Sequence, residues 1–397
     1  MTPRLYYRDS TLTLHTGDAI DVLTVLPDDS VHCVVTSPPY WRLRDYGTAS
    51  WIDGNPSCAH SVRRGSTCAD SHPIDRSIDA GGASREDHQY GREATPEDYV
   101  DTLRAVFAQL RRVLVDTGTV WLNLGDSYSA DPTGRTGNEL EANILSGTTV
   151  TGLLGESWGD ANRTRFVPRK NLWGMPWRVA FALQSEGWIL RNAIVWHKPN
   201  AMPESVRDRL STRYEMLFLF TAKQQYWFDL DAIREPLARP EELTEGIVIG
   251  GSRKGRHAGV ESTARRRGHS TYGKYSTTEA FTGGPPGSAM SPTGYRHTTA
   301  HPRGRNPGDV WSMPTRPLWE AHFAAFPIDI PLRCIGAGCP PSGTVLDPFS
   351  GAATTGLAVR QLHRSYLGVD VSPEFHAIGL GRLGLDPASS DRSRRAA

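Results

Sequence analysis

The feature that most limits how this chain can fold is an apolar run that stops abruptly at a rigid turn. The run Val31-His32-Cys33-Val34-Val35 has the composition of a buried strand, and Thr36-Ser37-Pro38-Pro39-Tyr40-Trp41 follows it directly. Neither proline can donate a backbone hydrogen bond, and each holds the preceding residue extended. The turn is therefore stiff, and its main-chain carbonyl oxygens are free to accept hydrogen bonds. Such a loop at the end of a buried strand suits a ligand that carries an amino group.

The segment before this strand indicates a parallel sheet. Leu12 and Leu14 alternate on one face of a short strand that leads into an acidic turn at Asp18, and a helix over residues 19–26 precedes the apolar run. A strand, a helix and a second strand in this order call for parallel pairing. Asp18 then lies at the carboxyl end of a strand, in a position to cap the helix that follows.

A second strand-turn-helix unit lies near the other end of the chain. A short buried strand over residues 343–346 leads into Asp347 and a turn of small residues, after which a helix begins. Gly351 lets the backbone approach a ligand closely, and Asp347 beside the turn suits a cofactor with a cationic group better than a phosphate. The next strand, residues 365–369, ends in Asp370, where an acid can accept hydrogen bonds from ribose hydroxyls. A nicotinamide dehydrogenase would show a similar unit, so this pattern alone leaves both enzyme classes open.

The stretch between the two units predicts further helices and strands. Thr95 is a good N-cap, and a proline and two acids follow it in the first helical turn. Residues 129–165 are rich in Gly, Ser, Thr and Asn with little periodicity, so we expect a flexible loop over the site. Apolar periodicity predicts helices over residues 95–114, 175–186 and 328–335, and strands over residues 119–124, 188–196 and 215–221.

Basic residues are concentrated in one segment. The chain carries 44 Lys and Arg against 43 acids, so its net charge of +1 says nothing about partners. Residues 250–308 contain ten Lys or Arg and two acids, which gives this segment a charge of +8 and the remainder −7. The segment is also rich in Gly and Pro, with interspersed aromatic residues. This composition is typical of a solvated disordered linker, and equally of a segment that contacts DNA phosphates and orders on binding.

Cysteine usage indicates a reducing compartment. The five cysteines are few and odd in number, and two lie in apolar runs, which fits a cytoplasmic protein better than a disulfide framework. Cys58, His60, Cys68 and His72 fall within fifteen residues and could surround a zinc ion. Their spacing fits no standard zinc pattern, so a mobile loop beside the active site explains the segment better. The N-terminus lacks a secretion-signal pattern and no apolar run approaches a membrane span, so we expect a soluble, cytoplasmic protein.

Two motifs together carry a resemblance to a known family. The turn Ser37-Pro38-Pro39-Tyr40 resembles the catalytic motif of DNA amino-methyltransferases, which methylate an exocyclic nitrogen of a DNA base. Alone it could be a rigid turn or a proline-rich recognition motif. The segment Asp347-Pro348-Phe349-Ser350-Gly351-Ala352-Ala353-Thr354-Thr355-Gly356, however, resembles the cofactor loop of the same family. The resemblance implies that Ser37 and the Pro38 carbonyl accept hydrogen bonds from the target amine, that Tyr40 stacks on the base, and that Pro39 completes the catalytic turn.

The same resemblance implies S-adenosylmethionine as the cofactor. In the family, an acid at the position of Asp18 contacts the adenine, and the block that ends near Phe326 packs beside the cofactor, although Phe326 could equally be a core aromatic residue. The family loop usually carries a further glycine where Ala353 or its neighbour stands, which narrows the pocket slightly. The residues expected around the cofactor are Asp18, Phe326, Asp347, Phe349, Gly351, Thr354 and Asp370.

The order of the motifs resembles the permuted beta group of this family. We therefore expect an α/β fold, a Rossmann-like S-adenosylmethionine-dependent methyltransferase sheet that is circularly permuted and carries an inserted basic target-recognition region. Residues 1–235 would form the catalytic part, 236–308 the insert that orders on DNA, 309–385 the cofactor-binding part and 386–397 a disordered tail. The insert would contact DNA through basic residues such as Arg253, Lys254, Arg265, Arg266 and Arg267.

The resulting hypothesis is a site-specific DNA methyltransferase that flips a base out of the duplex and methylates N4 of cytosine. Serine at the first motif position favours cytosine, but adenine N6 stays an alternative because both amines need the same acceptors. An RNA or protein methyltransferase would not need the basic insert, and a catalytically silent DNA-binding protein would need neither loop. Cys339 could suggest carbon-5 methylation, but that nucleophile follows the cofactor loop and Cys339 precedes it. The expected partners are double-stranded DNA and a cognate restriction endonuclease, with no metal.

Overall fold

The computed structural model describes residues 2–43, 50–52, 84–86, 89–129, 168, 170–237, 247–248, 296–298, 301–316 and 326–385. Two compact units are present, Met1–Asp229 with Asp309–Ala397, and Leu230–Gly308. Several sequence predictions fall outside the described residues. They concern most of the 129–165 loop, the 386–397 tail, the zinc candidates Cys58, His60, Cys68 and His72, and the basic residues Arg253, Lys254, Arg265, Arg266 and Arg267.

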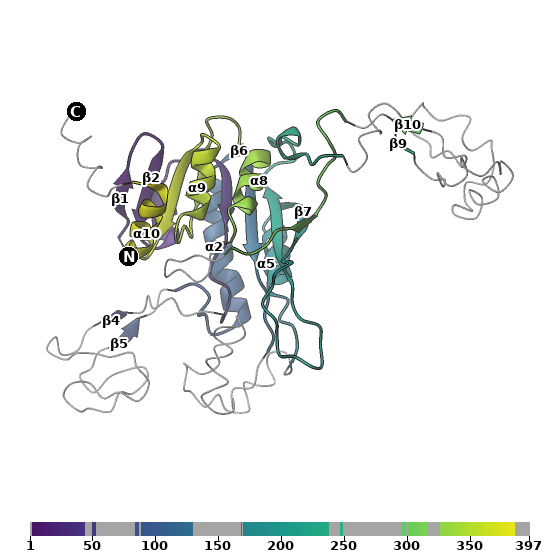
Figure 1. Ribbon diagram of the computed structural model, residues 1–397. Helices are drawn as coiled ribbons and strands as arrows, with labels where there is room; N and C mark the ends of the chain where they lie inside the picture. Colours follow the sequence, from purple (N-terminus) through teal and green to yellow (C-terminus); the bar gives the residue numbers. More distant parts are fainter. Residues whose placement is uncertain are drawn as a thin grey trace, which may run out of the picture. The chain divides into compact units, whose positions relative to one another are not determined.

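Nine strands of the described chain form one sheet (Figure 1). In sheet order they are β1 (Arg4–Arg8), β2 (Leu12–Thr16), β13 (Ser365–Asp370), β12 (Thr344–Asp347), β3 (Val31–Thr36), β6 (Leu114–Leu124), β8 (Tyr214–Thr221), β7 (Ile189–His197) and β11 (Val310–Ser312). A separate two-stranded pair joins β4 (Ser50–Ile52) to β5 (Ser84–Glu86).

The two ends of the chain meet inside this sheet. β12 pairs in parallel with both β13 and β3, and it sets Val345 opposite Cys33 and Leu346 opposite Val34. β13 in turn pairs in parallel with β2. The last strands of the chain are thus inserted between β2 and β3, which confirms the predicted circularly permuted, Rossmann-like sheet.

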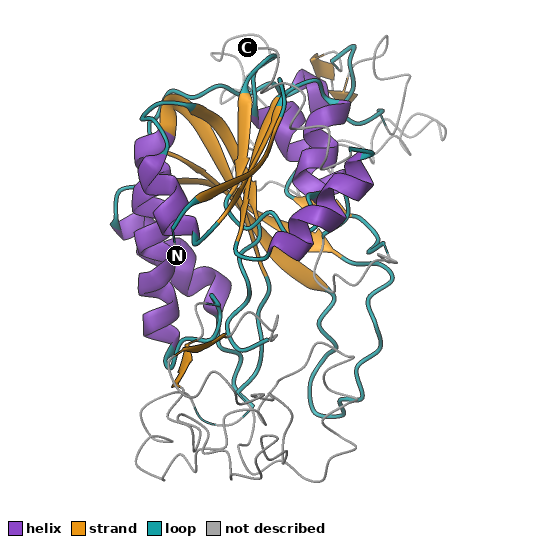
Figure 2. Cartoon of the chain, turned by 90° about the vertical axis from the view of Figure 1, so that its left-hand side faces the viewer, coloured by secondary structure: helices purple, strands orange, loops and turns teal. Residues whose placement is uncertain are grey.

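Helices cover both faces of the sheet (Figure 2). On one face α1 (Ala19–Val25), α2 (Pro96–Val113) and α5 (Met175–Ser185) pack in that order, and α8 (Asp329–Gly338), α9 (Thr354–Gln361) and α10 (Pro373–Leu383) form a second packed set. Buried side chains of α2 such as Leu103, Phe107 and Leu110 join Val34 and Leu122 of the strands in one core. None of the described helices combines the length and the apolar character needed to cross a membrane.

Local signals explain where the first helices begin. The Asp18 carboxylate accepts the backbone N–H of Ile20 at 2.8 Å and so caps α1. At α2, Thr95 and Asp98 exchange side-chain and backbone hydrogen bonds as a capping box, and Pro96 occupies the first helical position. The caps place both helix starts at the edge of the sheet where β2 and β3 end.

The sheet departs from the predicted strands in two ways. β8 runs antiparallel to both β6 and β7, and the strands β1 and β11 had no counterpart in the sequence prediction. β11 is only three residues long, which is too short for a period to be recognised. β6 begins at Leu114, whereas the sequence predicted a start at residue 119. The prediction started too late because Asp116 and Thr117 are exposed and interrupt the apolar pattern.

The unit Leu230–Gly308 is described in part. It contains the 3-10 helix Asp231–Ile233 and the paired strands β9 (Ile247–Val248) and β10 (Arg296–Thr298). Arg303 forms an ion pair with Asp231 at 2.9 Å, and Arg305 forms one with Glu235 at the same distance. Two of the basic residues in this segment therefore have acidic partners within their own unit.

Candidate active site

The two predicted turns lie at neighbouring strand ends. β3 ends at Thr36 and β12 ends at Asp347, and the Thr36 hydroxyl donates a hydrogen bond of 2.7 Å to the Asp347 carboxylate. Because parallel strands end at the same edge of a sheet, the Ser37–Tyr40 turn and the loop after Asp347 start side by side. The two turns therefore share one edge of the sheet.

Asp347 is a buried acid that anchors the turn after β12. Only 2% of the residue is exposed, and its carboxylate accepts hydrogen bonds from Thr36, from Thr355 at 2.7 Å and from the N–H of Phe349 at 3.1 Å. Burial raises the pKa of Asp347 to about 6, and the three donors act in the opposite direction. Asp347 therefore shapes the turn that follows it and contributes negative charge at the strand end.

The turn itself has the backbone expected for close approach. Gly351 has φ of +49°, in the left-handed region, and its N–H donates a hydrogen bond of 2.8 Å to the Asp370 carboxylate at the end of β13. Ala353 also adopts a left-handed conformation, with φ of +54°. A Cβ atom added at Gly379 would lie 2.9 Å from that of Ala353, so Gly379 in α10 makes room for Ala353. This packing accommodates the alanine where the family more often has glycine.

Asp370 ties together three chain segments. Its carboxylate accepts the N–H groups of Gly351 and Ser372, and its carbonyl oxygen accepts the N–H of Gly17 from the turn after β2. Burial raises the pKa of Asp370 to about 6. Asp18 follows Gly17, so three acids, Asp18, Asp347 and Asp370, stand at the ends of the adjacent strands β2, β12 and β13.

Tyr90 connects two of the predicted cofactor residues. Its hydroxyl donates to the Asp18 carboxylate at 3.2 Å, and its ring meets that of Phe349 edge-on with centroids 4.9 Å apart. Desolvation and the nearby Asp18 charge raise the pKa of Tyr90, so the phenol stays protonated and acts as a donor. Phe326 lies just before α8 and is half-buried, and within the described chain no ring contact joins it to this group.

The Thr354 side chain serves a structural contact. Its hydroxyl accepts a hydrogen bond of 3.0 Å from Arg382, which also reaches the carbonyl of Ala352.

The residues of this edge fit S-adenosylmethionine, which carries a positively charged sulfur, an ammonium group and ribose hydroxyls. Three acids flank a glycine turn that leaves the backbone open to a ligand, and a half-buried aromatic ring, Phe349, lies beside them.

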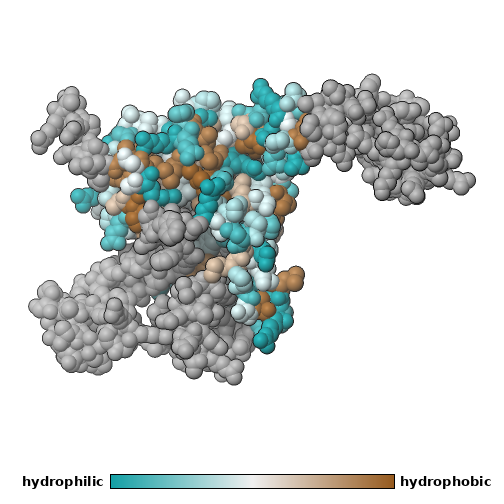
Figure 3. Space-filling view, viewed as in Figure 1, coloured by the Kyte–Doolittle hydropathy of each residue, from teal (hydrophilic) through white to brown (hydrophobic). Residues whose placement is uncertain are grey.

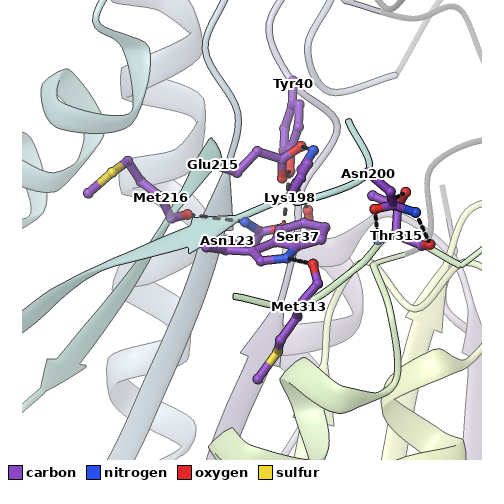
Figure 4. A network of polar contacts seen from close by, with 10 residues as sticks. Ser37, Tyr40, Asn123, Lys198, Asn200, Glu215, Met216, Met313 and Thr315 are labelled. Carbon is purple, nitrogen blue, oxygen red and sulfur yellow. Dashed lines mark hydrogen bonds and ion pairs between the residues drawn. The ribbon is translucent and has the colours of Figure 1, made fainter. Parts of the chain in front are cut away.

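Tyr40 is held by a chain of polar contacts (Figure 4). Its hydroxyl donates to Glu215 at 2.6 Å and lies 3.1 Å from the side-chain oxygen of Asn123, while the Ser37 hydroxyl donates to Tyr40 at 3.3 Å. The Asn123 amide group donates to the carbonyl of Met216 at 3.1 Å, which turns its oxygen toward Tyr40. The phenol is thus fixed from β6 and β8 at once.

Glu215 is itself paired with a cation. Lys198 forms an ion pair with the second carboxylate oxygen of Glu215, and the two side chains are only 20% and 16% exposed. The Lys198 ammonium also lies 4.5 Å from the centroid of the Trp196 ring. Because β8 is antiparallel, Glu215 at its start reaches the same edge as Lys198, which follows the end of β7.

The Tyr40 ring packs directly on backbone. A Cβ atom added at Gly125, just after β6, would lie 2.5 Å from a ring carbon of Tyr40, a distance that side chains do not tolerate.

The backbone carbonyls of the Ser37–Tyr40 turn differ in whether they accept a hydrogen bond. That of Pro39 accepts the Tyr99 hydroxyl at 3.0 Å and that of Tyr40 accepts the N–H of Leu43, whereas in the described chain no group donates to the carbonyl of Pro38.

The three cysteines among the described residues are unsuited to nucleophilic chemistry. Cys33, Cys334 and Cys339 are buried free thiols. Burial raises the pKa of Cys339 to about 11, so the thiol stays protonated at neutral pH. Carbon-5 methylation, which needs a thiolate nucleophile, is not supported by Cys339.

Sequence reasoning missed five residues of this site, Tyr90, Tyr99, Asn123, Lys198 and Glu215. Lys198 and Glu215 lie in stretches that resemble later blocks of the family, and this was the one available signal. No local pattern distinguishes them from core or surface residues, because their contacts depend on the order and direction of strands in the sheet.

Comparisons with known proteins agree with this arrangement. The sequence profile of the family described as DNA methylase matches residues 31–380. Type II methyltransferase M.XycI of Xanthomonas campestris pv. cyanopsidis is 33% identical over 375 residues, covering 94% of this chain and 87% of that protein. M.Cfr9I of Citrobacter freundii is 32% identical with the same coverage.

The fold also has a counterpart among solved structures. The PvuII DNA methyltransferase, named cytosine-N4-specific, superposes with a TM-score of 0.52 at 14% identity, covering 98% of this chain and 93% of that one. At this identity the likeness concerns the fold alone. The sequence matches go further, and the chain belongs to the DNA methylase family, the S-adenosylmethionine-dependent enzymes that methylate N4 of cytosine or N6 of adenine in DNA.

Proposed function

We propose that this enzyme methylates N4 of cytosine in duplex DNA after flipping the target base into the pocket beside Tyr40. Serine at position 37, the first of the catalytic turn, supports cytosine over adenine. A cytosine-N4-specific enzyme also shares the fold. Duplex DNA as the substrate follows the family to which the chain belongs.

The observation that carries the proposal is the direction of the hydrogen bonds around Tyr40. Glu215, paired with Lys198, takes the hydrogen of the Tyr40 hydroxyl, and the Tyr40 oxygen in turn takes the hydrogen of Ser37. With its hydrogen so occupied, the Ser37 oxygen acts as an acceptor. The chain of contacts therefore presets Ser37 to receive an N–H group, as an exocyclic amine requires.

A second acceptor stands next to the first. The Pro38 carbonyl has no donor among the described residues, although Pro38 is buried, whereas the carbonyls of Pro39 and Tyr40 are both used. A buried carbonyl normally has a hydrogen-bond partner. Ser37 and Pro38 can thus receive the two N–H groups of one amine.

These acceptors address the main chemical difficulty. The lone pair of an aromatic amine is delocalised into the ring, which makes the nitrogen a poor nucleophile. Two oriented acceptors, Ser37 and Pro38, draw the amine toward tetrahedral geometry and localise the lone pair for in-line attack. S-adenosylmethionine, when bound, supplies an electrophilic methyl group on a positively charged sulfur.

Tyr40 provides the surface for the flipped base. Flipping costs a few kcal/mol, and stacking of a base on an aromatic ring returns about 1 to 3 kcal/mol. The contacts of Tyr40 with Glu215 and Gly125 fix the ring before DNA arrives, so little conformational entropy is lost on binding.

Residues at the adjacent strand ends would hold the cofactor. Asp18 and Asp370 offer carboxylates for its polar groups, with Phe349 and Tyr90 beside them. Asp347, whose oxygens are occupied by protein donors, acts by ordering the loop around Gly351. Phe326 and Thr354 are retained as candidates from the family resemblance.

The proposal is tested by identifying the methylated product. Purified enzyme is incubated with methyl-labelled S-adenosylmethionine and, in separate reactions, duplex DNA, RNA and a peptide pool, and the digested products are separated by mass spectrometry. We expect label in N4-methylcytosine from DNA alone. Label in N6-methyladenine would overturn the choice of base, and label in RNA or peptide would overturn the choice of substrate.

Sequence recognition is proposed to lie in residues 236–308. The charge of this segment supports contact with phosphates, with Arg253, Lys254, Arg265, Arg266 and Arg267 as the candidates. The names of the curated relatives, type II methyltransferases, support a cognate restriction endonuclease as a functional partner. An enzyme with these partners works in the cytoplasm, beside the DNA that it protects.

A further inference from the structure

The connection between β7 and β8 is far longer than a hairpin needs. It spans residues 198–213, whereas antiparallel neighbours can be joined by two to five residues. In Figure 1 it leaves the sheet as a long loop below β7. We call residues 198–213 the β7–β8 arm. A connection of this length in a compact domain generally has a function of its own.

The β7–β8 arm begins and ends beside the residues that contact Tyr40. At its base the N–H of Lys198 donates to the carbonyl of Arg213 at 2.8 Å, and the Lys198 side chain pairs with Glu215, the acceptor of the Tyr40 hydroxyl. Asn200 exchanges hydrogen bonds with the backbone of Thr315 at 2.8 and 2.9 Å. The base of the arm is therefore next to the place where the proposed function puts the target base.

Internal contacts brace the β7–β8 arm. Arg209 donates to Glu204 at 2.6 Å, and Glu204 also accepts the N–H of Thr212 at 3.3 Å. The Arg209 guanidinium lies 4.0 Å from the centroid of the Tyr128 ring, which follows β6. Asp208 pairs with Lys170. These contacts tie the arm to itself and to Tyr128 and Lys170.

The outer side chains of the arm combine apolar and cationic groups. Leu210 is 90% exposed and Met202 is 66% exposed. Both acids of the arm, Glu204 and Asp208, are already paired, whereas Arg207 and Arg213 are exposed and have no ion-pair partner among the described residues. In the space-filling view this lower region shows brown apolar atoms next to teal polar ones (Figure 3).

We infer that the β7–β8 arm is a DNA-inserting element, in which Leu210 enters the base stack beside the target and Arg207 and Arg213 contact the flanking phosphates. The inference rests on the proposed function, since it takes duplex DNA as the substrate. An apolar side chain on a braced loop can wedge between base pairs and favour the unstacked state. Unpaired arginines beside it match the charge of the backbone that such a wedge must approach.

An apolar wedge at Leu210 would supply a step that Tyr40 alone does not. Tyr40 stabilises a base that is already extrahelical, but it does not act on the duplex before flipping. A side chain that fills the space left in the stack stabilises the opened duplex. Leu210 on the arm and Tyr40 in the Ser37–Tyr40 turn would thus favour the same state from two sides.

The test compares Leu210→Ala with wild type on two DNA duplexes. Both carry a site at which wild-type enzyme methylates plasmid DNA, but in the second duplex the target base lies opposite an abasic position and is already unpaired. Single-turnover methyl transfer should slow by about tenfold or more on the paired duplex, and by less than about twofold on the abasic duplex. Val25→Ala is the matched control, because Val25 is 63% exposed and lies at the end of α1, away from the strand ends that form the site.

Two results would overturn the inference. Equal slowing on both duplexes would mean that Leu210 acts by general damage to the site, and unchanged rates on both would mean that it does not enter the stack. The double variant Arg207→Gln/Arg213→Gln adds an independent measure. The slope of log binding constant against log salt concentration is negative, and its magnitude should fall by about 2 in the double variant. Leu210→Ala should leave this slope unchanged. An unchanged slope in the double variant would show that Arg207 and Arg213 do not contact DNA phosphates.

Failure of the inference is distinguishable from failure of the proposed function. Mass spectrometry of the wild-type product names the methylated base, whatever the outcome for Leu210. If the base is adenine, the same two duplexes are built around adenine and the comparison stands. If DNA is not methylated at all, the proposed function fails before the arm is tested.

Discussion

The hydroxyl of Thr36 donates a hydrogen bond of 2.7 Å to the carboxylate of Asp347, although 311 positions separate the two residues in the chain. Both side chains are buried. This contact joins the end of β3 to the end of β12, and so aligns the two turns that follow. The permuted order of the chain does not separate the two turns, because β3 and β12 are neighbours in the sheet.

Thr36→Val should destabilise the protein while keeping the shape of the residue. Asp347 would lose one of its three donors, and an unsatisfied buried polar group costs about 1 to 3 kcal/mol. The pKa of Asp347 is raised by burial to about 6, so the folded protein holds its proton in a range where the unfolded chain has lost it. Stability contributed by this group therefore falls as pH rises from about 4 to about 6.

The loss in Thr36→Val should accordingly be larger at pH 8, where Asp347 is charged, than at pH 5. Urea denaturation of both proteins at the two pH values measures the difference. A loss that is equal at both pH values would show that the Thr36 hydroxyl does not stabilise the charged carboxylate.

Glu215→Gln should separate orientation of Tyr40 from stability. The charged acceptor of the Tyr40 hydroxyl disappears and the half-buried Lys198 loses its partner, so we expect a slower methyl transfer and a loss of about 1 to 3 kcal/mol in unfolding free energy. The double variant Glu215→Gln/Lys198→Met removes the orphaned charge as well. It should regain stability but not rate.

Single-turnover rates and denaturation midpoints for the three proteins check this. Recovery of rate together with stability in the double variant would mean that Glu215 has no role in orienting Tyr40. Binding of S-adenosylmethionine, measured by calorimetry, should be unchanged in all three, because neither residue contacts the cofactor loop.

Gly125→Ala should reduce activity through the Tyr40 ring. The added methyl group would lie 2.5 Å from a ring carbon, so the ring must move away from its position over the backbone. We expect methyl transfer to fall by about tenfold, since small misplacements of a catalytic group have effects of this size or larger. Gly381→Ala is the control: nothing lies within 4 Å of its Cβ position in α10, and it should leave the rate unchanged and add about 0.5 to 1 kcal/mol of stability. Equal rates for wild type and Gly125→Ala would contradict the packing of the ring.

Glu93→Gln should change how stability depends on pH. Burial raises the pKa of Glu93 to about 7, and one of its carboxylate oxygens has no hydrogen-bond partner in the described structure. Between pH 4.5 and 7 the unfolded chain is ionised at this residue while the folded protein holds the proton, so stability falls as pH rises through this window. The glutamine removes this term. The difference in melting temperature, variant minus wild type, should be near zero at pH 4.5 and positive at pH 8. Thermal scans at several pH values measure it. A difference that does not change with pH would contradict the burial of a charged group.

The sequence was sufficient for the parts of the site that are local. A buried strand followed directly by a polar turn marks a strand end, and both Ser37–Tyr40 and the turn after Asp347 have this form. The caps at Asp18 and Thr95 are equally local, and the structure contains both. The order of the motifs, through its resemblance to the permuted family, predicted that the last strands complete the sheet begun at the N-terminus, whereas their place between β2 and β3 comes from the structure alone.

The contacts of Glu215 could not be predicted, for a topological reason. In an all-parallel sheet the first residue of a strand lies at the edge opposite the ligand, and Glu215 would be far from Tyr40. β8 is antiparallel to its neighbours, which brings its first residues to the site. The role of Tyr90 was not predicted either, because Tyr90 lies before α2 in a segment without periodicity. Only the structure shows that its hydroxyl donates a hydrogen bond to Asp18.

The most direct test of the account is single-turnover methylation of duplex DNA by Tyr40→Ala and Tyr40→Phe, with the product identified by mass spectrometry. Tyr40→Phe keeps the stacking ring but loses the contacts to Glu215 and Ser37, and should be slower than wild type by about tenfold, the value of one hydrogen bond to a charged group. Tyr40→Ala should form no measurable N4-methylcytosine while it binds S-adenosylmethionine as tightly as wild type. Full activity of Tyr40→Ala would contradict the assignment of the Ser37–Tyr40 turn as the place where the base amine is methylated.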